Sequence, residues 1–150
     1  MMAMVNVDFF QTVKAALDFG LWSDKTPIED RLDSYSNDQF SWFYCAIGAE
    51  QRLVLAVSPL VATAMSVQMY DCPANQLSLQ ETFDAVTEVT NIMAGLVQKK
   101  YWPNHEIGLA QAMELTEAER FTCRNCELST MISVDGGILF VGVATGKARD

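Results

Sequence analysis

The chain has 150 residues, of which half are hydrophobic and 19% are charged, with 19 acidic residues against 10 basic ones. This length and composition indicate a single globular domain over residues 1–150 and exclude a disordered chain. The formal net charge of −9 disfavours nucleic acids and anionic membranes as partners, because both are bound through clustered lysine and arginine.

Neither a targeting signal nor a membrane span is evident in the sequence. Met1–Phe10 lacks the basic start of a signal peptide. The most apolar run, Leu53–Met65, is too short to cross a bilayer and is interrupted by Ser58 and Pro59. We therefore expect a cytoplasmic protein.

The four cysteines are expected to be reduced thiols, because no secretory signal accompanies them. Cys123 and Cys126 form a CxxC pair, but Cys45 and Cys72 lack the spacing that would complete a zinc site. The pair also precedes a strand-like run, whereas a redox pair usually opens a helix. We interpret both as ordinary thiols near a strand end, and we interpret His105, which follows a turn, as a surface residue.

The first half of the chain contains one predicted helix and one predicted hairpin. Apolar residues at helical spacing predict a helix over Val5–Phe19. The polar stretch Asp24–Asn37 is interpreted as a loop. Two β-rich runs follow, Gln39–Ile47 and Arg52–Ser58, and the short turn between them is typical of a β-hairpin.

Two helices are predicted next. Ser58 as N-cap and a proline at the first helical position predict a helix over Pro59–Tyr70. After a short loop, Ser78 and Glu81 form a capping box, in which each side chain serves an unpaired backbone N–H of the first turn. This helix should continue to about Tyr101, because a proline follows two residues later.

Three further strands are predicted near the C-terminus: Ile107–Glu114, Glu127–Val134 and Ile138–Thr145. The turn Asp135–Gly137 should join the last two as a hairpin. The sequence leaves open whether Arg120–Arg124 forms a short strand. Gly146–Asp150 is expected to be a frayed tail. The order α-β-β-α-α-β-β-β predicts an α+β domain in which helices pack on a largely antiparallel sheet.

The long second-half helix has two distinct faces. Its apolar residues should face the sheet: Val86, Val89, Met93, Leu96 and Val97. Asp84, Glu88, Asn91 and Gly95 share the opposite side, within a wedge of about 60° at 100° per residue. An exposed carboxylate is usually only solvated, but asparagine and glycine are both unfavourable in mid-helix. Their presence on the same stripe as Glu88 indicates a surface built for contact.

The stretch from Asp84 to Gly95, DAVTEVTNIMAG, resembles the active helix of the CheX/CheC family of chemotaxis phosphatases. That family carries Asp or Ser, then Glu four residues later and Asn three residues after that. Asp84, Glu88 and Asn91 match these positions, and the predicted element order also agrees along nearly the whole chain. The resemblance implies a phosphatase that hydrolyses the aspartyl phosphate of a phosphorylated CheY-like response regulator.

The resemblance also implies a role for each motif residue. Asn91 would orient the attacking water, and Glu88 would pair with the regulator's active-site lysine. Asp84 would assist at the rim, and Gly95 would allow the partner's backbone to approach closely. No metal or cofactor is needed on this chain, because the Mg²⁺ belongs to the regulator. On this basis Asn91→Ala should abolish stimulated dephosphorylation and leave the fold unchanged.

Two departures from the family pattern leave alternatives open. The family usually carries a proline in the strand after the motif helix, whereas Leu109–Glu114 contains none. The same offsets applied to the first helix give Asp8, Thr12 and Ala15, so the chain has at most one site. One alternative is a non-catalytic module of the same fold that binds a receiver domain or another signalling partner, and the other is a purely structural interaction domain. An open sheet edge would also permit a homodimer.

Overall fold

The computed structural model describes residues 7–18, 25–28, 35–118, 126–134 and 136–145. Within them a six-stranded antiparallel sheet has the strand order β1-β5-β6-β3-β2-β4. The strands run as follows: β1 Lys25–Pro27, β2 Ser41–Ile47, β3 Gln51–Val57, β4 Gln111–Met113, β5 Cys126–Val134 and β6 Gly137–Thr145. The predicted α+β class with a largely antiparallel sheet is confirmed.

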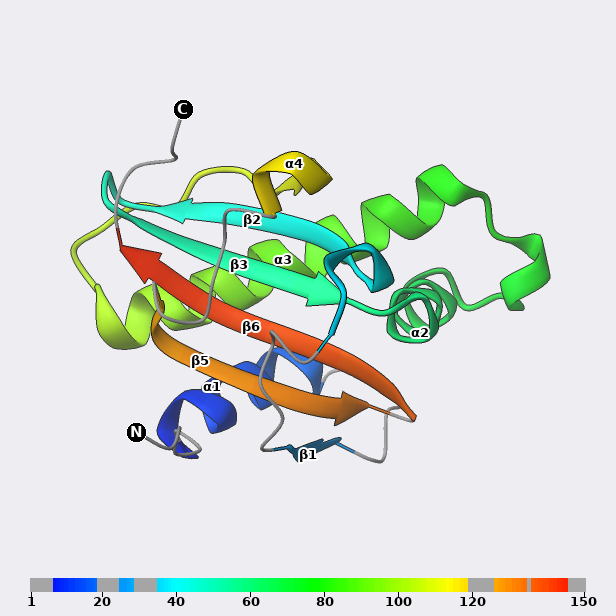
Figure 1. Cartoon of the computed structure of the whole chain (residues 1–150), viewed down its shortest axis with the longest axis horizontal. Coiled ribbons are helices and arrows are strands. Elements are labelled where there is room, and N and C mark those ends of the chain that lie inside the picture. Colours follow the sequence, from blue (N-terminus) through cyan, green and yellow to red (C-terminus); the bar gives the residue numbers. More distant parts are fainter. Residues whose placement is uncertain (1–6, 19–24, 29–34, 119–125, 135, 146–150) are drawn as a thin grey trace.

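Three helices cover one face of the sheet, as Figure 1 shows. They are α1 Val7–Leu17, α2 Pro59–Tyr70 and α3 Leu79–Tyr101. Side chains alternate between the two faces of each strand, so β2 sends Phe43, Cys45 and Ile47 into the core beneath the helices. Met93 and Val97 of α3 are fully buried in the same core. The long helix is therefore anchored along its apolar face.

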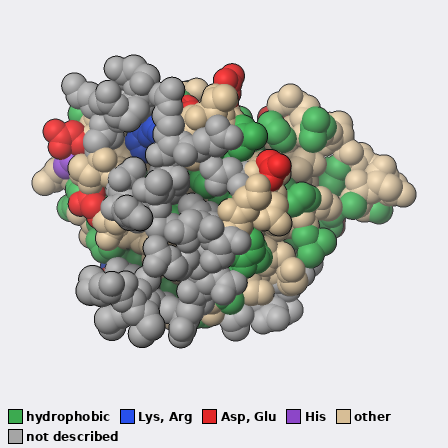
Figure 2. Space-filling view, in the orientation of Figure 1, with side chains coloured by type: hydrophobic (Ala, Val, Ile, Leu, Met, Phe, Trp, Pro, Cys, Tyr) green, Lys and Arg blue, Asp and Glu red, His purple; other side chains and the backbone are tan. Residues whose placement is uncertain are grey.

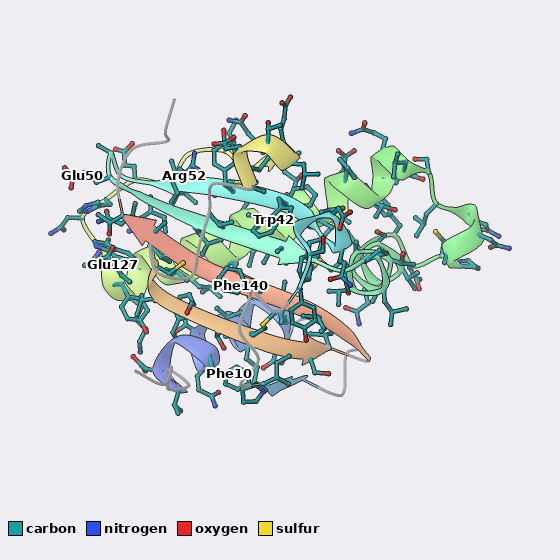
Figure 3. All side chains as sticks on the ribbon, in the orientation of Figure 1. Phe10, Trp42, Glu50, Arg52, Glu127 and Phe140 are labelled. Atoms are coloured by element: carbon teal, nitrogen blue, oxygen red, sulfur yellow. The ribbon has the colours of Figure 1, made fainter. Side chains whose placement is uncertain are left out.

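The opposite face of the sheet carries a smaller apolar cluster that includes Trp42 and Phe140, both labelled in Figure 3. The short helix α4, Leu115–Ala118, is held against the sheet by one charged contact. Arg52 Nη1 lies 3.0 Å from Glu117 Oε2, and its guanidinium lies 4.7 Å from the centre of the Tyr44 ring. This contact fixes the segment that follows β4.

Several element boundaries differ from the sequence-based predictions. The loop interpretation of Asp24–Asn37 was wrong at Lys25–Pro27, which pairs with β5 as an edge strand. The predicted strand Ile107–Glu114 shrinks to β4, with one isolated bridge between Ile47 and Ile107. Helix α4 was not predicted. The proposed strand at Arg120–Arg124 and the frayed tail at Gly146–Asp150 lie outside the described residues.

Local signals fixed the hairpins and the helix starts. Ile47 pairs with Gln51 across a tight turn, in which Gly48 has φ +66°, and Val134 pairs with Gly137 at the second hairpin. Ser58 does precede α2, but its hydroxyl caps no helical N–H. It instead accepts a hydrogen bond from the backbone N–H of Ile138 at 3.0 Å. Ser58 thus ties the start of α2 to β6.

Ser58→Ala should remove this tie and lower the free energy of unfolding by about 1 kcal/mol, because the N–H of Ile138 loses its acceptor. For a chain of this length, that loss corresponds to a decrease of roughly 2–4 °C in Tm. Thermal unfolding by circular dichroism measures it. Ser133→Ala is a matched control, since no hydrogen bond of that hydroxyl is found in the described part of the chain. Equal losses in the two variants would contradict the assigned role of Ser58.

Candidate functional site

Helix α3 begins and ends where its sequence signals place it. The Ser78 hydroxyl accepts the N–H of Glu81 at 3.1 Å, and the Glu81 carboxylate accepts the N–H of Ser78 at 2.9 Å. The predicted capping box is therefore confirmed. Lys99 and Lys100 occupy the last turn, where positive charge complements the helix dipole. The motif residues lie in the middle of a well-defined helix.

The C-terminal end of α3 is also tied to α1. Asp8 accepts hydrogen bonds from Lys100 and Tyr101, at 3.1 Å in each case. The hydrogen bond from Lys100 is the main cause that holds the pKa of the Asp8 carboxyl below its ordinary value. These exposed contacts add to the packing of the buried apolar face, which sets the rotation of α3 about its axis and hence the direction in which the motif residues point.

The four motif residues do not share the same exposure. Asp84 and Glu88 are exposed, whereas Asn91 and Gly95 are half-buried. The sequence predicted that all four would lie on one solvent-exposed face of the helix. The structure corrects this for Asn91 and Gly95. The reason is tertiary, since the segment Ile107–Ala110 crosses α3 beside Asn91 and Gly95.

The Asn91 carboxamide is held in one orientation by that segment. The backbone N–H of Ala110 donates to Asn91 Oδ1 at 2.9 Å. Because an N–H needs an acceptor, this contact assigns the amide oxygen to the Ala110 side and directs Nδ2 away from it. Nδ2 makes no hydrogen bond within the described residues and is not completely buried, so it is free to donate to another molecule. Asn91 is therefore a pre-oriented donor.

The Cys45 thiol lies next to this amide and is a weak hydrogen-bond donor to two nearby oxygen atoms. Its Sγ lies 3.4 Å from Gly108 O and 3.9 Å from Asn91 Oδ1. Burial raises the pKa of the Cys45 thiol, and the backbone hydrogen bond at Gly108 offsets only part of that rise. The sulfur is thus a neutral S–H at neutral pH. It acts here as a small packing group beside the oxygen of Asn91, a role that the spacing of the cysteines did not indicate.

Glu88 differs from Asp84 in its availability. Asp84 Oδ1 accepts a hydrogen bond from Gln80 Nε2 at 2.9 Å on the preceding turn of α3. Glu88 makes no hydrogen bond or ion pair within the described ranges, although it is exposed and one turn from Asn91. Its carboxylate is therefore the group on this stripe that can take a cationic partner without breaking an internal contact.

Gly95 is not required by the packing of the chain itself. A Cβ atom added there would meet only Ile107 Cδ1, at 4.0 Å, which is ordinary van der Waals contact. A glycine in a helix interior nevertheless costs about 1 kcal/mol relative to alanine. Internal packing thus gives no reason for the glycine, and an approach by another molecule stays a prediction.

Neither a metal cluster nor a membrane span is found among the described residues. No group of three or more His, Cys, Asp or Glu side chains there is placed to hold a metal ion. No described helix has both the length and the apolar composition needed to cross a bilayer. Cys123 lies outside the described residues, so the CxxC interpretation is untested, while His105 is exposed in a turn after α3, as predicted.

No protein-family model matches the sequence, and no curated protein matches it. Solved structures do match over nearly the whole chain. The chemotaxis protein CheX from Vibrio vulnificus has a TM-score of 0.65 at 16% identity, covering 97% of this chain and 98% of its own. A chain of the CheX-CheY-BeF3-Mg²⁺ complex from Borrelia burgdorferi gives 0.62 at 16% identity, covering 97% of this chain and 100% of its own.

The same fold also occurs in a chain of the FliM-SpeE complex from H. pylori. There the TM-score is 0.52 at 10% identity, with 95% of this chain and 90% of that chain covered. At these identities the likeness establishes the fold, which is that of CheX and CheC-like chemotaxis proteins. The fold that the motif helix led us to expect is therefore confirmed.

Proposed function

We propose that this chain hydrolyses the aspartyl phosphate of a CheY-like response regulator. The observation that carries the proposal is the pairing of Glu88 and Asn91, one turn apart on α3. The Glu88 carboxylate is exposed and has no partner among the described residues, and the Asn91 oxygen is held by the N–H of Ala110, which leaves Nδ2 as the donor. The occurrence of this fold in a chain of the CheX-CheY-BeF3-Mg²⁺ complex supports a receiver domain as the partner.

Glu88 docks the regulator in this proposal. Its carboxylate accepts a charge-assisted hydrogen bond from the lysine beside the phosphorylated aspartate, because lysine can only donate. Asp84 lies one turn before Glu88 and adds negative charge at the rim. Gly95, one turn after Asn91, leaves room for the regulator's backbone.

Asn91 positions the nucleophile. Nδ2–H donates to the oxygen of a water molecule and leaves a lone pair of that oxygen directed at phosphorus. The new P–O bond forms as the bond between phosphorus and the aspartyl oxygen breaks. The aspartate leaves as a carboxylate, and the water's protons pass to the phosphate product and to solvent. The regulator supplies the Mg²⁺, which neutralises the charge on the phosphoryl oxygens.

The hydrogen bond between Ala110 and Asn91 also bears on the absence of the family's proline. The segment in which the family usually carries it here provides the backbone N–H of Ala110 as the group that orients Asn91. Proline lacks an N–H, so at Ala110 itself it would remove this contact. A pre-oriented amide is thus present without the proline.

Decay of the regulator's phosphate tests the proposal directly. A panel of CheY-like receiver domains, phosphorylated with acetyl phosphate and freed of donor, should lose phosphate at least tenfold faster with the wild-type chain than alone. Radiolabelled phosphate release measures this. Unchanged decay for every receiver in the panel would overturn the phosphatase proposal.

A non-catalytic binding module is the second candidate, and the occurrence of the same fold in a chain of the FliM-SpeE complex supports it. Under this alternative the chain binds a phosphorylated receiver domain and leaves its decay rate unchanged. Isothermal titration with and without BeF3-Mg²⁺, run beside the decay assay, separates the two functions.

A further inference from the structure

An apolar hollow lies beside the motif residues and belongs to no function assigned so far. It has a volume of about 260 Å³ and lies at the corner of the sheet, between the start of β2, the end of β4 and the N-terminal half of α3. It is lined mainly by apolar side chains: Phe40, Trp42, Phe83, Ala112, Met113 and Leu115. Binding sites for small molecules usually begin at about 300 Å³, so the hollow fits a protein side chain better than a metabolite.

The rigid parts of the hollow are built from both faces of the sheet. Trp42 and Met113 are 3% and 6% exposed and form its floor. Phe83 stacks edge-on against the buried Phe43 ring, with the ring centres 5.6 Å apart. The floor is thus fixed before any partner arrives, which limits the entropy lost on binding.

Its rim, in contrast, is exposed and apolar. Phe83 and Leu115 are 36% and 42% exposed, and the Ala112 side chain is exposed on the edge strand β4. Figure 2 shows hydrophobic side chains gathered on the side of the molecule where α2 and the N-terminal half of α3 lie, which Figure 1 locates. Exposed apolar side chains around a preformed hollow are typical of a protein-binding surface.

The hollow and the proposed phosphatase site share two parts of the chain, helix α3 and the segment that runs through Ala110 into β4. Phe83 precedes Glu88 by five residues on α3, which is about 7–8 Å along the helix axis. On the other side, Ala112 follows Ala110 by two residues, and the Ala110 N–H orients Asn91. A partner bound at Glu88 and Asn91 therefore overlies the hollow with adjacent parts of its surface.

The charge around the hollow is acidic. Asp38 lines it, Asp84 lies one residue after Phe83, and Glu114 lies between two lining residues; all three are exposed. Among the described residues that line it, none is lysine or arginine. A complementary surface thus carries an apolar side chain with a basic residue next to it.

We propose that this hollow receives an apolar side chain of the receiver domain, from a segment next to the phosphorylated aspartate that also carries a basic residue. This rests on the proposed function, whose catalytic group lies outside the hollow. The hollow contributes affinity and selects among receiver domains, whereas Asn91 contributes to hydrolysis. A buried apolar contact from which neighbouring residues exclude water is the usual source of affinity in protein interfaces.

Ala112→Asp and Leu115→Asp test the proposal, because both side chains are exposed and both changes place a charge in the hollow. Each should raise the Kd for a receiver domain with BeF3-Mg²⁺ at least tenfold, which is about 1.4 kcal/mol. The rate of dephosphorylation at saturating receiver should stay within twofold of wild type. Leu60→Asp, on the exposed side of α2 outside the hollow, is the matched control and should leave both values unchanged.

The possible results separate this inference from the proposed function. If the hollow variants bind as wild type does while Glu88→Gln binds more weakly, the hollow lies outside the interface and the phosphatase proposal stands. If Leu60→Asp weakens binding as much as the hollow variants do, the effect is not specific to the hollow and the inference is overturned. If the wild-type chain binds none of the receiver domains tested, both proposals are overturned.

Discussion

Asn91→Asp is expected to lower stimulated dephosphorylation about 100-fold or more, in keeping with the loss of one oriented hydrogen-bond donor at a reacting group. The carboxylate can still accept the N–H of Ala110, because it offers an oxygen where Asn91 has Oδ1. It can no longer donate to the attacking water, and its negative charge repels the phosphoryl oxygens. The free energy of unfolding should stay within about 1 kcal/mol of wild type.

Asn91→Ala should lose the same activity and also lose stability. It removes the acceptor of a hydrogen bond that lies partly inside the protein, and an unsatisfied N–H there costs about 1–3 kcal/mol. The sequence-based expectation that this variant keeps its fold stays a prediction, to which the structure adds an expected loss of stability. Comparing Asn91→Asp with Asn91→Ala by decay assay and denaturant unfolding separates the catalytic donor from the structural acceptor.

Asn104→Asp is the control for the added charge, since Asn104 is exposed in the turn after α3 and belongs to neither the motif nor the hollow. It should match wild type in both assays. If Asn91→Asp retains wild-type activity, the water-orienting role of Nδ2 is excluded.

Glu88→Gln should weaken binding of a BeF3-Mg²⁺ receiver domain about 30-fold or more, because removing one member of a buried charge pair in an interface costs about 2–5 kcal/mol. The change keeps the shape of the side chain and removes only the charge. Stability should be nearly unchanged, since the carboxylate is exposed and makes no contact within the described part of the chain. Titration calorimetry gives the Kd, and thermal unfolding gives the stability.

Asp84→Asn is a matched control for Glu88→Gln on the same helix face. Asp84 already accepts a hydrogen bond from Gln80, and it lies further from Asn91 than Glu88 does. We expect its effect on Kd to be less than fivefold and to diminish at high salt, as for a rim charge. A larger loss of affinity for Asp84→Asn than for Glu88→Gln would contradict the assignment of Glu88 as the docking carboxylate.

Most of the fold could be predicted because its signals are local. The α3 boundaries follow from the capping box at Ser78 and from the proline two residues after Tyr101. The apolar spacing correctly placed Val86, Met93 and Val97 in the core. Each of these signals depends on residues within a few positions of one another, so no knowledge of the tertiary structure is needed to interpret them.

The errors arose where a distant segment decides the local structure. Lys25–Pro27 forms a strand only because β5 offers it a partner more than one hundred residues later. The predicted strand at Ile107–Glu114 is shorter because its first half bonds to α3 and to the end of β2. Neither contact has a counterpart in the neighbouring sequence.

The sequence by itself therefore determined that a carboxylate and an amide lie one turn apart on a capped amphipathic helix. Only the tertiary structure decided that Glu88 has no partner in the described part of the chain, that the N–H of Ala110 holds the Asn91 oxygen, and that a hollow opens at Phe83. The physical reason is that helix periodicity depends on residues three and four apart, whereas the orientation of an amide depends on whichever distant backbone group packs against it.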